Sequence, residues 1–358
     1  MNTLFLHIGL MKTGTTAIQR ALKISSDVSP WSFLPESHGL LRSPDLPNRW
    51  VSRVRRQLRS SDVVLSDENF VGRRLLDGDP HTEAARAIQL VRTFDWPSTV
   101  LVVTVRPFYR WAESLCEHLE LHIGERSAAP EFFDAFLQEQ EVDPLVPFLS
   151  RILDDVDQIG LRVIPYSADG VVDQFFAAIG SPTRPPSDAA SRRLNETTPA
   201  PVAALAASLQ SCNRRQKRWI TRELMTQISW PDEPVNFSPF TADQQRHLAL
   251  ITRETANSLQ DLRDRFRSSF GDFDDWLEEC RDVRIRPGPE SPEFEDYSRE
   301  AGVTLIQHLI SRETGGLATL MRRNRKGFLP WVKVLLWWGP IAVLKRPLRV
   351  VLRSVRGF

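Results

Sequence analysis

The run from residue 9 to residue 16, Gly-Leu-Met-Lys-Thr-Gly-Thr-Thr, carries residue types that bind anions. Gly9 and Gly14 let the backbone curve closely around an anion, with its N–H groups pointing inward. Lys12 adds a positive charge, and three hydroxyls add donors: those of Thr13, Thr15 and Thr16. A short apolar run precedes the loop and a helical pattern follows it, so a helix N-terminus joins the site. The pattern predicts a phosphate-binding loop; the alternative is a plain strand-to-helix turn capped by a threonine.

The position of the lysine separates this loop from that of the nucleoside triphosphatases. In their pattern, GxxxxGK[ST], the lysine directly follows the second glycine. Here Lys12 precedes Gly14, and Thr15 stands after the glycine. No strand pattern ends in a magnesium-binding carboxylate, apart from the Ser-Asp-Glu run at residues 66–68. A kinase that uses ATP or GTP is therefore the second enzyme hypothesis.

A second candidate phosphate site follows the β-branched run at residues 99–105, the clearest strand pattern of the chain. Arg106 comes directly after this run, and Ser114 lies eight residues further on, in a predicted helix. The guanidinium of arginine presents a planar fork of donors that suits phosphate oxygens. The pairing and spacing favour a joint phosphate site over a surface arginine and a solvated serine.

Together these residues resemble a known family. The run His7-Ile-Gly-Leu-Met-Lys-Thr-Gly-Thr-Thr-Ala-Ile-Gln19 is similar to the 5′-phosphosulfate loop of sulfotransferases that use 3′-phosphoadenosine 5′-phosphosulfate (PAPS), above all the bacterial members. The resemblance implies that PAPS is bound at its 5′ side by Gly9, Lys12, Thr13, Gly14, Thr15, Thr16 and Gln19. It implies that the 3′-phosphate is bound by Arg106 and Ser114. It covers roughly the first 200 residues, and Asn195-Glu-Thr197 is weakly similar to a further element of these enzymes.

Sulfuryl transfer gives two residues catalytic roles. Charge that develops on the leaving phosphate needs stabilisation, and Lys12 is the candidate for this role. The acceptor must lose a proton, and Glu68, just beyond a predicted strand, is the candidate general base. The resemblance supports Glu68, because related bacterial enzymes have a Ser-x-Glu run whose glutamate is the base. Weaker alternatives are His38, His118 and His122, whereas His7 is expected in the core; no metal is required.

Alternating apolar strands and helical patterns predict the fold class. Strands are expected at residues 3–8, 62–66, 99–105 and 161–166, and helices at residues 15–24, 108–123 and 171–179. Such alternation is typical of a parallel sheet covered on both faces. The prediction is an α/β, P-loop-like three-layer fold with a central parallel sheet and a helical C-terminal half. That half is expected to contain a loop at 181–201, helices at 202–270, an ordered loop at 272–296 and a helix at 297–312.

The predicted domain organisation is one catalytic domain followed by a tail. Residues 1–312 are expected to form the sulfotransferase domain, with a motif-bearing core at 1–200 and a helical part at 201–312. Residues 313–358 form a basic amphipathic tail. The tail has ten lysines and arginines and no acidic residue after Glu313, so the chain's net charge of +1 becomes −9 for its first 313 residues.

The tail favours a membrane surface as a partner. Its uncharged, mostly apolar stretch, residues 334–344, is shorter than the about 20 residues that a spanning helix needs. Tryptophans flanked by lysines and arginines instead favour anionic lipid at residues 322–358. Packing on the domain and dimerisation are the alternatives.

The composition excludes several classes of protein. With 41% hydrophobic and 25% charged residues, the chain is ordinary for a globular protein, and its near-neutral charge argues against a nucleic-acid partner. Three widely spaced cysteines, Cys116, Cys212 and Cys280, argue against a disulfide framework or a zinc site and favour reduced thiols in the cytoplasm. The N-terminus has no basic region and no small-residue cleavage site, so no signal peptide is predicted.

Six arginines precede the second predicted strand: Arg42, Arg49, Arg53, Arg55, Arg56 and Arg59. Such a cluster usually forms a solvated helix face. The alternative is that it binds an anionic acceptor, such as an anionic glycan.

The expected function is therefore that of a PAPS-dependent sulfotransferase acting on a hydroxyl or amine, with a glycan or lipid head group as the expected acceptor. The expected location is the cytoplasm, at the inner face of the membrane. The alternatives are a P-loop kinase of small molecules and a catalytically inactive, membrane-associated nucleotide-binding protein.

Overall fold

The computed structural model describes residues 2–9, 13–25, 30–35, 41, 46–67, 79–122, 143–155, 160–167, 170–181 and 237–297, with backbone only at 117–122. The chain divides into two compact units. The first comprises Met1–Leu115, Asp134–Glu196 and Gln244–Arg284, and it holds the sheet and the candidate site. The second comprises Cys116–Phe133, Thr197–Asp243 and Ile285–Phe358. In the described part of the second unit, Phe237 and Phe294 pack edge to face with ring centres 5.5 Å apart.

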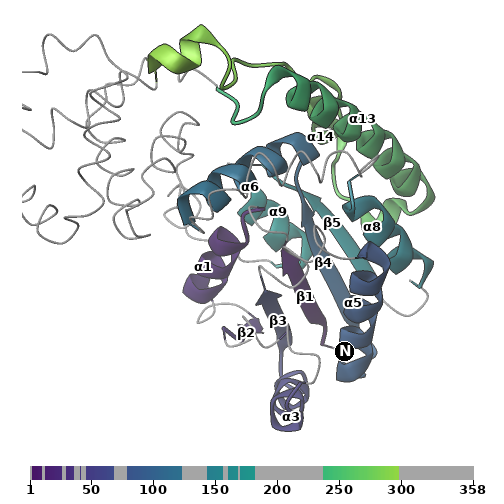
Figure 1. Cartoon of the computed structure of the whole chain (residues 1–358). Helices are drawn as coiled ribbons and strands as arrows, with labels where there is room; N and C mark the ends of the chain where they lie inside the picture. Colours follow the sequence, from purple (N-terminus) through teal and green to yellow (C-terminus); the bar gives the residue numbers. More distant parts are fainter. Residues whose placement is uncertain are drawn as a thin grey trace, which may run out of the picture. The chain divides into compact units, whose positions relative to one another are not determined.

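A five-stranded parallel sheet forms the centre of the first unit (Figure 1). Its strands are β1 (Leu4–Gly9), β2 (Trp31–Phe33), β3 (Asp62–Asp67), β4 (Thr99–Val105) and β5 (Gly160–Pro165), in the order β2-β3-β1-β4-β5. Every pairing is parallel, so the carboxyl ends of all five strands meet at one edge. The α/β prediction and the four predicted strands are confirmed. The sequence pattern missed β2, because three residues are too few to show a period.

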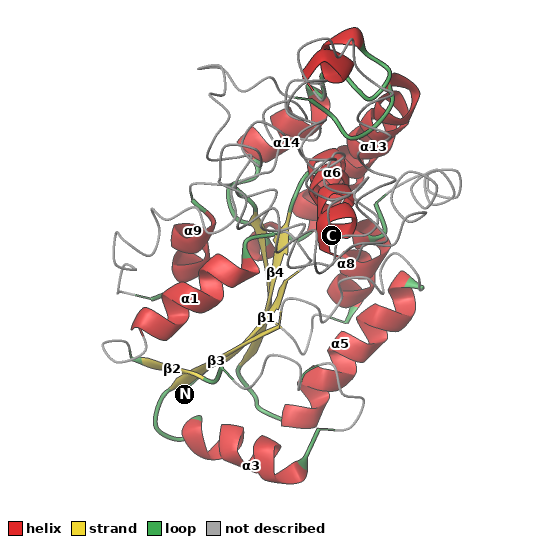
Figure 2. Ribbon diagram, turned by 60° about the vertical axis from the view of Figure 1, so that its left-hand side comes forward, coloured by secondary structure: helices red, strands yellow, loops and turns green. Residues whose placement is uncertain are grey.

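Helices cover both faces of this sheet, which makes three layers (Figure 2). One face carries α1 (Thr15–Ser25) and α9 (Val171–Ala178). The other carries α3 (Asn48–Gln57), α5 (Pro80–Phe94), α8 (Leu145–Asp154), and parts of α13 (Ala242–Arg265) and α14 (Asp274–Arg281). Successive strand residues alternate between the faces: Leu4, Leu6 and Ile8 face the second set of helices, while Phe5 faces the first.

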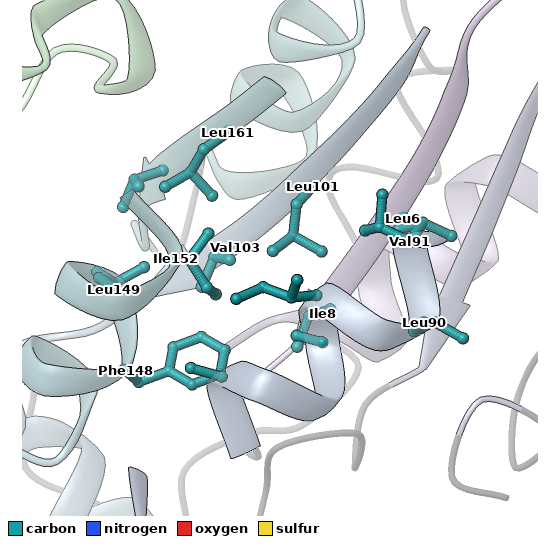
Figure 3. Close-up of a cluster of buried hydrophobic side chains, with 14 of the residues drawn as sticks. Leu6, Ile8, Leu90, Val91, Leu101, Val103, Phe148, Leu149, Ile152 and Leu161 are labelled. Carbon is teal, nitrogen blue, oxygen red and sulfur yellow. The ribbon is translucent and has the colours of Figure 1, made fainter. Parts of the chain in front are cut away.

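The larger core lies between the sheet and the helices α5 and α8. Figure 3 shows the side chains that meet there: Leu6, Ile8, Leu101, Val103 and Leu161 from the sheet, Leu90 and Val91 from α5, and Phe148, Leu149 and Ile152 from α8. Burying each aliphatic side chain of this size contributes about 1.5–3 kcal/mol. This core fixes β1 and β4, the two strands that lead into the site.

The chain beyond residue 236 differs in part from the prediction. The expected loop at 272–296 is wrong in part, because it contains α14 and a further helical segment at 292–297. The apolar residues Trp276, Leu277 and Cys280 share one face of α14 and enter the core of the sheet, a short period that the acidic composition conceals. Of the predicted helices at 202–270, the structure describes α13. Residues 182–236 and 298–358 lie outside the described residues.

Candidate anion-binding site

Gly14 lies in a position that only glycine fits. It stands between β1 and α1 with φ +80°, in the left-handed region that side chains disfavour. A β-carbon there would lie 2.9 Å from Cγ1 of Val171 and 3.0 Å from Cε2 of Tyr166, closer than van der Waals contact allows. Backbone conformation and packing therefore both require the glycine that the loop pattern singled out.

The N-terminus of α1 directly follows Gly14. The N–H of Ile18 donates to the carbonyl oxygen of Gly14 at 3.1 Å, so the helix begins at Thr15. The first N–H groups of a helix have no acceptor within it, and the helix dipole makes this end positive. Thr15 is 1% exposed, and its Oγ1 has no hydrogen-bond partner among the described residues. A buried hydroxyl without a partner beside a helix N-terminus suits an anion that accepts hydrogen bonds.

The other residues of the predicted loop lie on either side of this turn. Gly9 ends β1, Thr13 is buried, and Thr16 is exposed on the first turn of α1. Lys12 lies outside the described residues. Gln19 is half-buried one turn further on, and its Nε2 donates to the carbonyl oxygen of Ser66 at 3.2 Å. In this structure Gln19 therefore ties α1 to the end of β3.

The topology of the sheet gives the loop its place. β1 has β3 on one side and β4 on the other, and both follow β1 in the chain. The connection after β1 runs through α1 to β2, on the β3 side of β1, whereas the connection after β3 runs through α5 to β4, on the opposite side. The connections that follow the neighbouring strands β1 and β3 therefore leave in opposite directions, which opens a crevice at the carboxyl ends of these strands. Gly14 lies at this switch point, where open α/β sheets bind their ligands.

Arg106 lies at the same edge and stacks on an aromatic ring. It directly follows β4, is half-buried, and its guanidinium carbon lies 4.9 Å from the ring centre of Tyr166. Tyr166 directly follows β5, and its N–H donates to the carbonyl oxygen of Val105 at 2.6 Å. The Tyr166 ring also closes on Gly14. Tyr166 therefore forms a wall that the loop and Arg106 share. The sequence pattern did not assign Tyr166 to the site, although its position at the end of a predicted strand was an available signal.

Ser114 lies on α6 (Phe108–His122), the helix that follows Arg106, and is half-buried. The predicted helix at 108–123 is thus confirmed. The joint role of Ser114 and Arg106 stays a prediction.

His7 is buried in β1, beneath the loop. Its Nδ1 lies 2.9 Å from the hydroxyl of Ser66, and its Nε2 lies 3.1 Å from the hydroxyl of Thr104. Phe175 of α9 packs edge to face on the imidazole, with ring centres 5.0 Å apart. Burial lowers the pKa of His7 to about 3, so the ring is neutral at physiological pH. His7 is a core residue, as predicted, and it ties β3 and β4 to β1 just below the site.

The candidate base, Glu68, lies outside the described residues, directly after Asp67 at the end of β3. Asp67 is buried and pairs in register with Ile8 of β1, so the chain leaves β3 at the edge where Gly14 lies. His38 also lies outside the described residues. The backbone of α6 includes His118 and His122, whose side chains are not described.

Four arginines of the predicted cluster, Arg49, Arg53, Arg55 and Arg56, lie on α3, away from this edge, and Arg59 follows the helix. Trp50, Val51 and Val54 are buried, whereas Arg49, Arg53, Arg56 and Arg59 are exposed. Arg55 donates to the carbonyl oxygens of Phe94 (2.8 Å) and Thr93 (3.2 Å) at the end of α5, just before β4 begins. The helix therefore packs at the amino edge of the sheet. Its exposed arginines agree with the prediction of a solvated helix face. Arg42 lies outside the described residues.

The described residues contain neither a helix that is long and apolar enough to cross a membrane nor a candidate metal-binding cluster of three side chains. Cys116 and Cys280 are buried thiols, while Cys212 and the tail, residues 313–358, lie outside the described residues.

Comparison with known proteins gives no assignment. No protein-family model matches the chain, and no curated protein matches it.

Proposed function

We propose that this protein is a sulfotransferase that moves a sulfuryl group from PAPS to a hydroxyl or amine of an acceptor. The observation that carries the proposal is the cradle at Gly14, closed by Tyr166 and followed by the unpartnered hydroxyl of Thr15. Such a cradle suits an anion with several acceptor oxygens. The resemblance of residues 7–19 to a 5′-phosphosulfate loop narrows the anion to PAPS.

The described residues fit the two ends of PAPS. The N-terminus of α1, with Thr15 and Thr16, would hold the oxygens of the 5′-phosphosulfate. Arg106, across Tyr166 from the loop, would pair with the 3′-phosphate, and Ser114 would add a hydroxyl donor. This arrangement gives each of the two anionic groups its own set of donors.

Catalysis in this proposal rests on charge and position. Lys12 and the loop N–H groups stabilise the negative charge that grows on the bridging oxygen as the bond to sulfur breaks. Glu68 accepts the proton from the acceptor as the new bond to sulfur forms. Lys12 follows β1 in the chain and Glu68 follows β3, and the carboxyl ends of these neighbouring strands meet at one edge, which supports the proposal that the two residues act together. The reaction needs no metal ion.

The acceptor is proposed to be a glycan or a lipid head group, reached in the cytoplasm at the inner face of the membrane. The basic, tryptophan-containing tail supports this location. Deleting residues 322–358 should move the protein from the membrane fraction to the soluble fraction of a cell lysate. An unchanged distribution would exclude the tail as the anchor.

A P-loop kinase is the second candidate, and Asp67 favours it. This carboxylate is buried at the end of β3, next to β1, where a kinase would place a magnesium ligand. An enzyme of this kind would need magnesium and a triphosphate, whereas the proposed sulfotransferase needs neither.

Transfer of label distinguishes the candidates. The full chain is incubated with PAPS radiolabelled in its sulfuryl group and with extracts of lipids and glycans, and in parallel with ATP radiolabelled in its γ-phosphate plus magnesium. We expect label from PAPS in one extract, and none with Lys12→Ala or Glu68→Ala. Label from ATP alone would identify a kinase. Label from neither donor would favour the inactive nucleotide-binding protein.

A further inference from the structure

We infer that Tyr166 is a positioning residue that holds Arg106 at a fixed distance from the loop at Gly14. The inference rests on the proposed function, because that function gives Arg106 a 3′-phosphate to bind. It adds a claim about specificity: the Tyr166 ring sets the spacing between the two anion subsites.

Three parts of Tyr166 make three different contacts. Its backbone N–H donates to the carbonyl oxygen of Val105, the residue before Arg106, at 2.6 Å. The face of its ring lies beneath the Arg106 guanidinium, 4.9 Å from ring centre to guanidinium carbon. The edge of its ring packs on Gly14, where a β-carbon would lie 3.0 Å from Cε2 and 3.4 Å from Cδ2. One side chain therefore touches both subsites.

These contacts restrict Arg106 in a way that its own backbone cannot. Arginine has a long side chain with many rotamers, and holding one of them costs conformational entropy. The guanidinium is attracted to the electron-rich face of an aromatic ring, which favours one position of the charge. Because the same ring packs on Gly14, the charge of Arg106 is held relative to the loop.

Specificity for two phosphates follows from this arrangement. A nucleotide that carries both a 5′- and a 3′-phosphate can reach the loop and Arg106 together only at the spacing that the ring sets. AMP, which lacks the 3′-phosphate, gains nothing from the position of Arg106. Tyr166 should therefore control the preference for 3′-phosphoadenosine 5′-phosphate (PAP) over AMP.

Two substitutions separate positioning from simple packing. Tyr166→Phe keeps the aromatic face, and Tyr166→Leu keeps apolar bulk beside Gly14 but removes that face. We expect the ratio of the AMP to the PAP dissociation constant to be unchanged in the Phe variant. In the Leu variant it should fall roughly fivefold, the effect of losing a cation–π contact at a partly exposed site. A variant that only weakens packing would lower both affinities equally and leave the ratio unchanged, which would overturn the inference.

A measurement without nucleotide tests the same contact even if the proposed function fails. Phenylglyoxal modifies accessible arginines, and peptide mass spectrometry gives the rate at Arg106, with exposed Arg49 as the internal reference. We expect Arg106 to react several times faster in Tyr166→Leu than in the wild type or Tyr166→Phe, with Arg49 unchanged. Equal rates at Arg106 in all three folded proteins would refute the positioning role. A wild type that does not prefer PAP to AMP would instead contradict the proposed function.

Discussion

The Tyr166 ring leaves no room for a β-carbon on Gly14, since such an atom would lie 3.0 Å from Cε2 of the tyrosine. The relationship joins the end of β5 to the start of α1, two segments that lie far apart in the chain. It makes the candidate loop part of a packed surface, and its geometry is therefore open to a direct mutational test.

Gly14→Ala should destabilise the fold and abolish anion binding. Alanine at this position would have to adopt a disfavoured φ, which costs about 1–2 kcal/mol. Its β-carbon would also clash with Val171 and Tyr166, which costs about 1–3 kcal/mol. Gly180 is the matched control, because it has φ +66° and no atom within 4 Å of the position of a β-carbon. Urea unfolding should show a larger loss in the free energy of unfolding for Gly14→Ala than for Gly180→Ala, and only Gly14→Ala should lose PAP binding. Equal losses in both variants would contradict the packing account.

Replacing His7 by glutamine should reduce the loss of stability in acid. Burial lowers the pKa of His7 to about 3, below its ordinary value of 6.5, so the unfolded chain binds the proton more readily. The stability due to neutral His7 is complete above pH 6.5 and is lost as the pH falls toward 3, at up to about 1.4 kcal/mol per pH unit. Urea unfolding between pH 7 and pH 4 should give a shallower slope for His7→Gln. Equal slopes would show that His7 is not buried in its neutral form.

Asp143→Asn should remove a loss of stability that occurs as the pH rises, whereas His7 causes a loss as the pH falls. Asp143 is 7% exposed, and burial raises its pKa to about 7, although its carboxylate accepts the N–H of Leu145 at 2.8 Å. The stability that this group contributes is complete below pH 3.8 and is lost as the pH rises through 7. Asparagine keeps the acceptor without the charge. The free energy of unfolding of the variant, relative to that of the wild type, should therefore rise by up to a few kcal/mol between pH 4 and pH 8. A constant difference over this range would contradict the raised pKa.

Arg55→Ala should lower stability, and Arg56→Ala should not. Arg55 donates to the last carbonyl oxygens of α5, which have no partner within that helix, and losing such bonds costs about 1–3 kcal/mol. Arg56 is exposed on the same helix and serves as the control. Thermal unfolding should separate the two variants, while both bind PAP as the wild type does. A loss of PAP binding in either would place α3 nearer the site than the structure does.

The sequence predicted the parts of the fold whose signal is local. β1, β4 and the turn at Gly14 were predictable because continuous apolar runs and a glycine with Lys and Thr neighbours lie within a few residues. Tyr166 was not assigned to the site, because its contacts with Arg106 and Gly14 depend on β4 and β5 becoming neighbours. The role of α14 in the core was missed because its acidic composition conceals the short apolar period of Trp276, Leu277 and Cys280. Long-range packing, rather than local propensity, places these residues.

The central claim is that the loop at Gly14 and Arg106 together bind a nucleotide with 5′- and 3′-phosphates. Isothermal titration calorimetry of the full chain without metal, using PAP, AMP, ADP and ATP, tests it most directly. We expect PAP to bind tightest. Arg106→Ala should lower PAP affinity by about ten- to a hundredfold, because a charge-assisted contact is lost, and should leave AMP affinity unchanged. No binding of PAP, or binding of ATP alone once magnesium is added, would contradict the account.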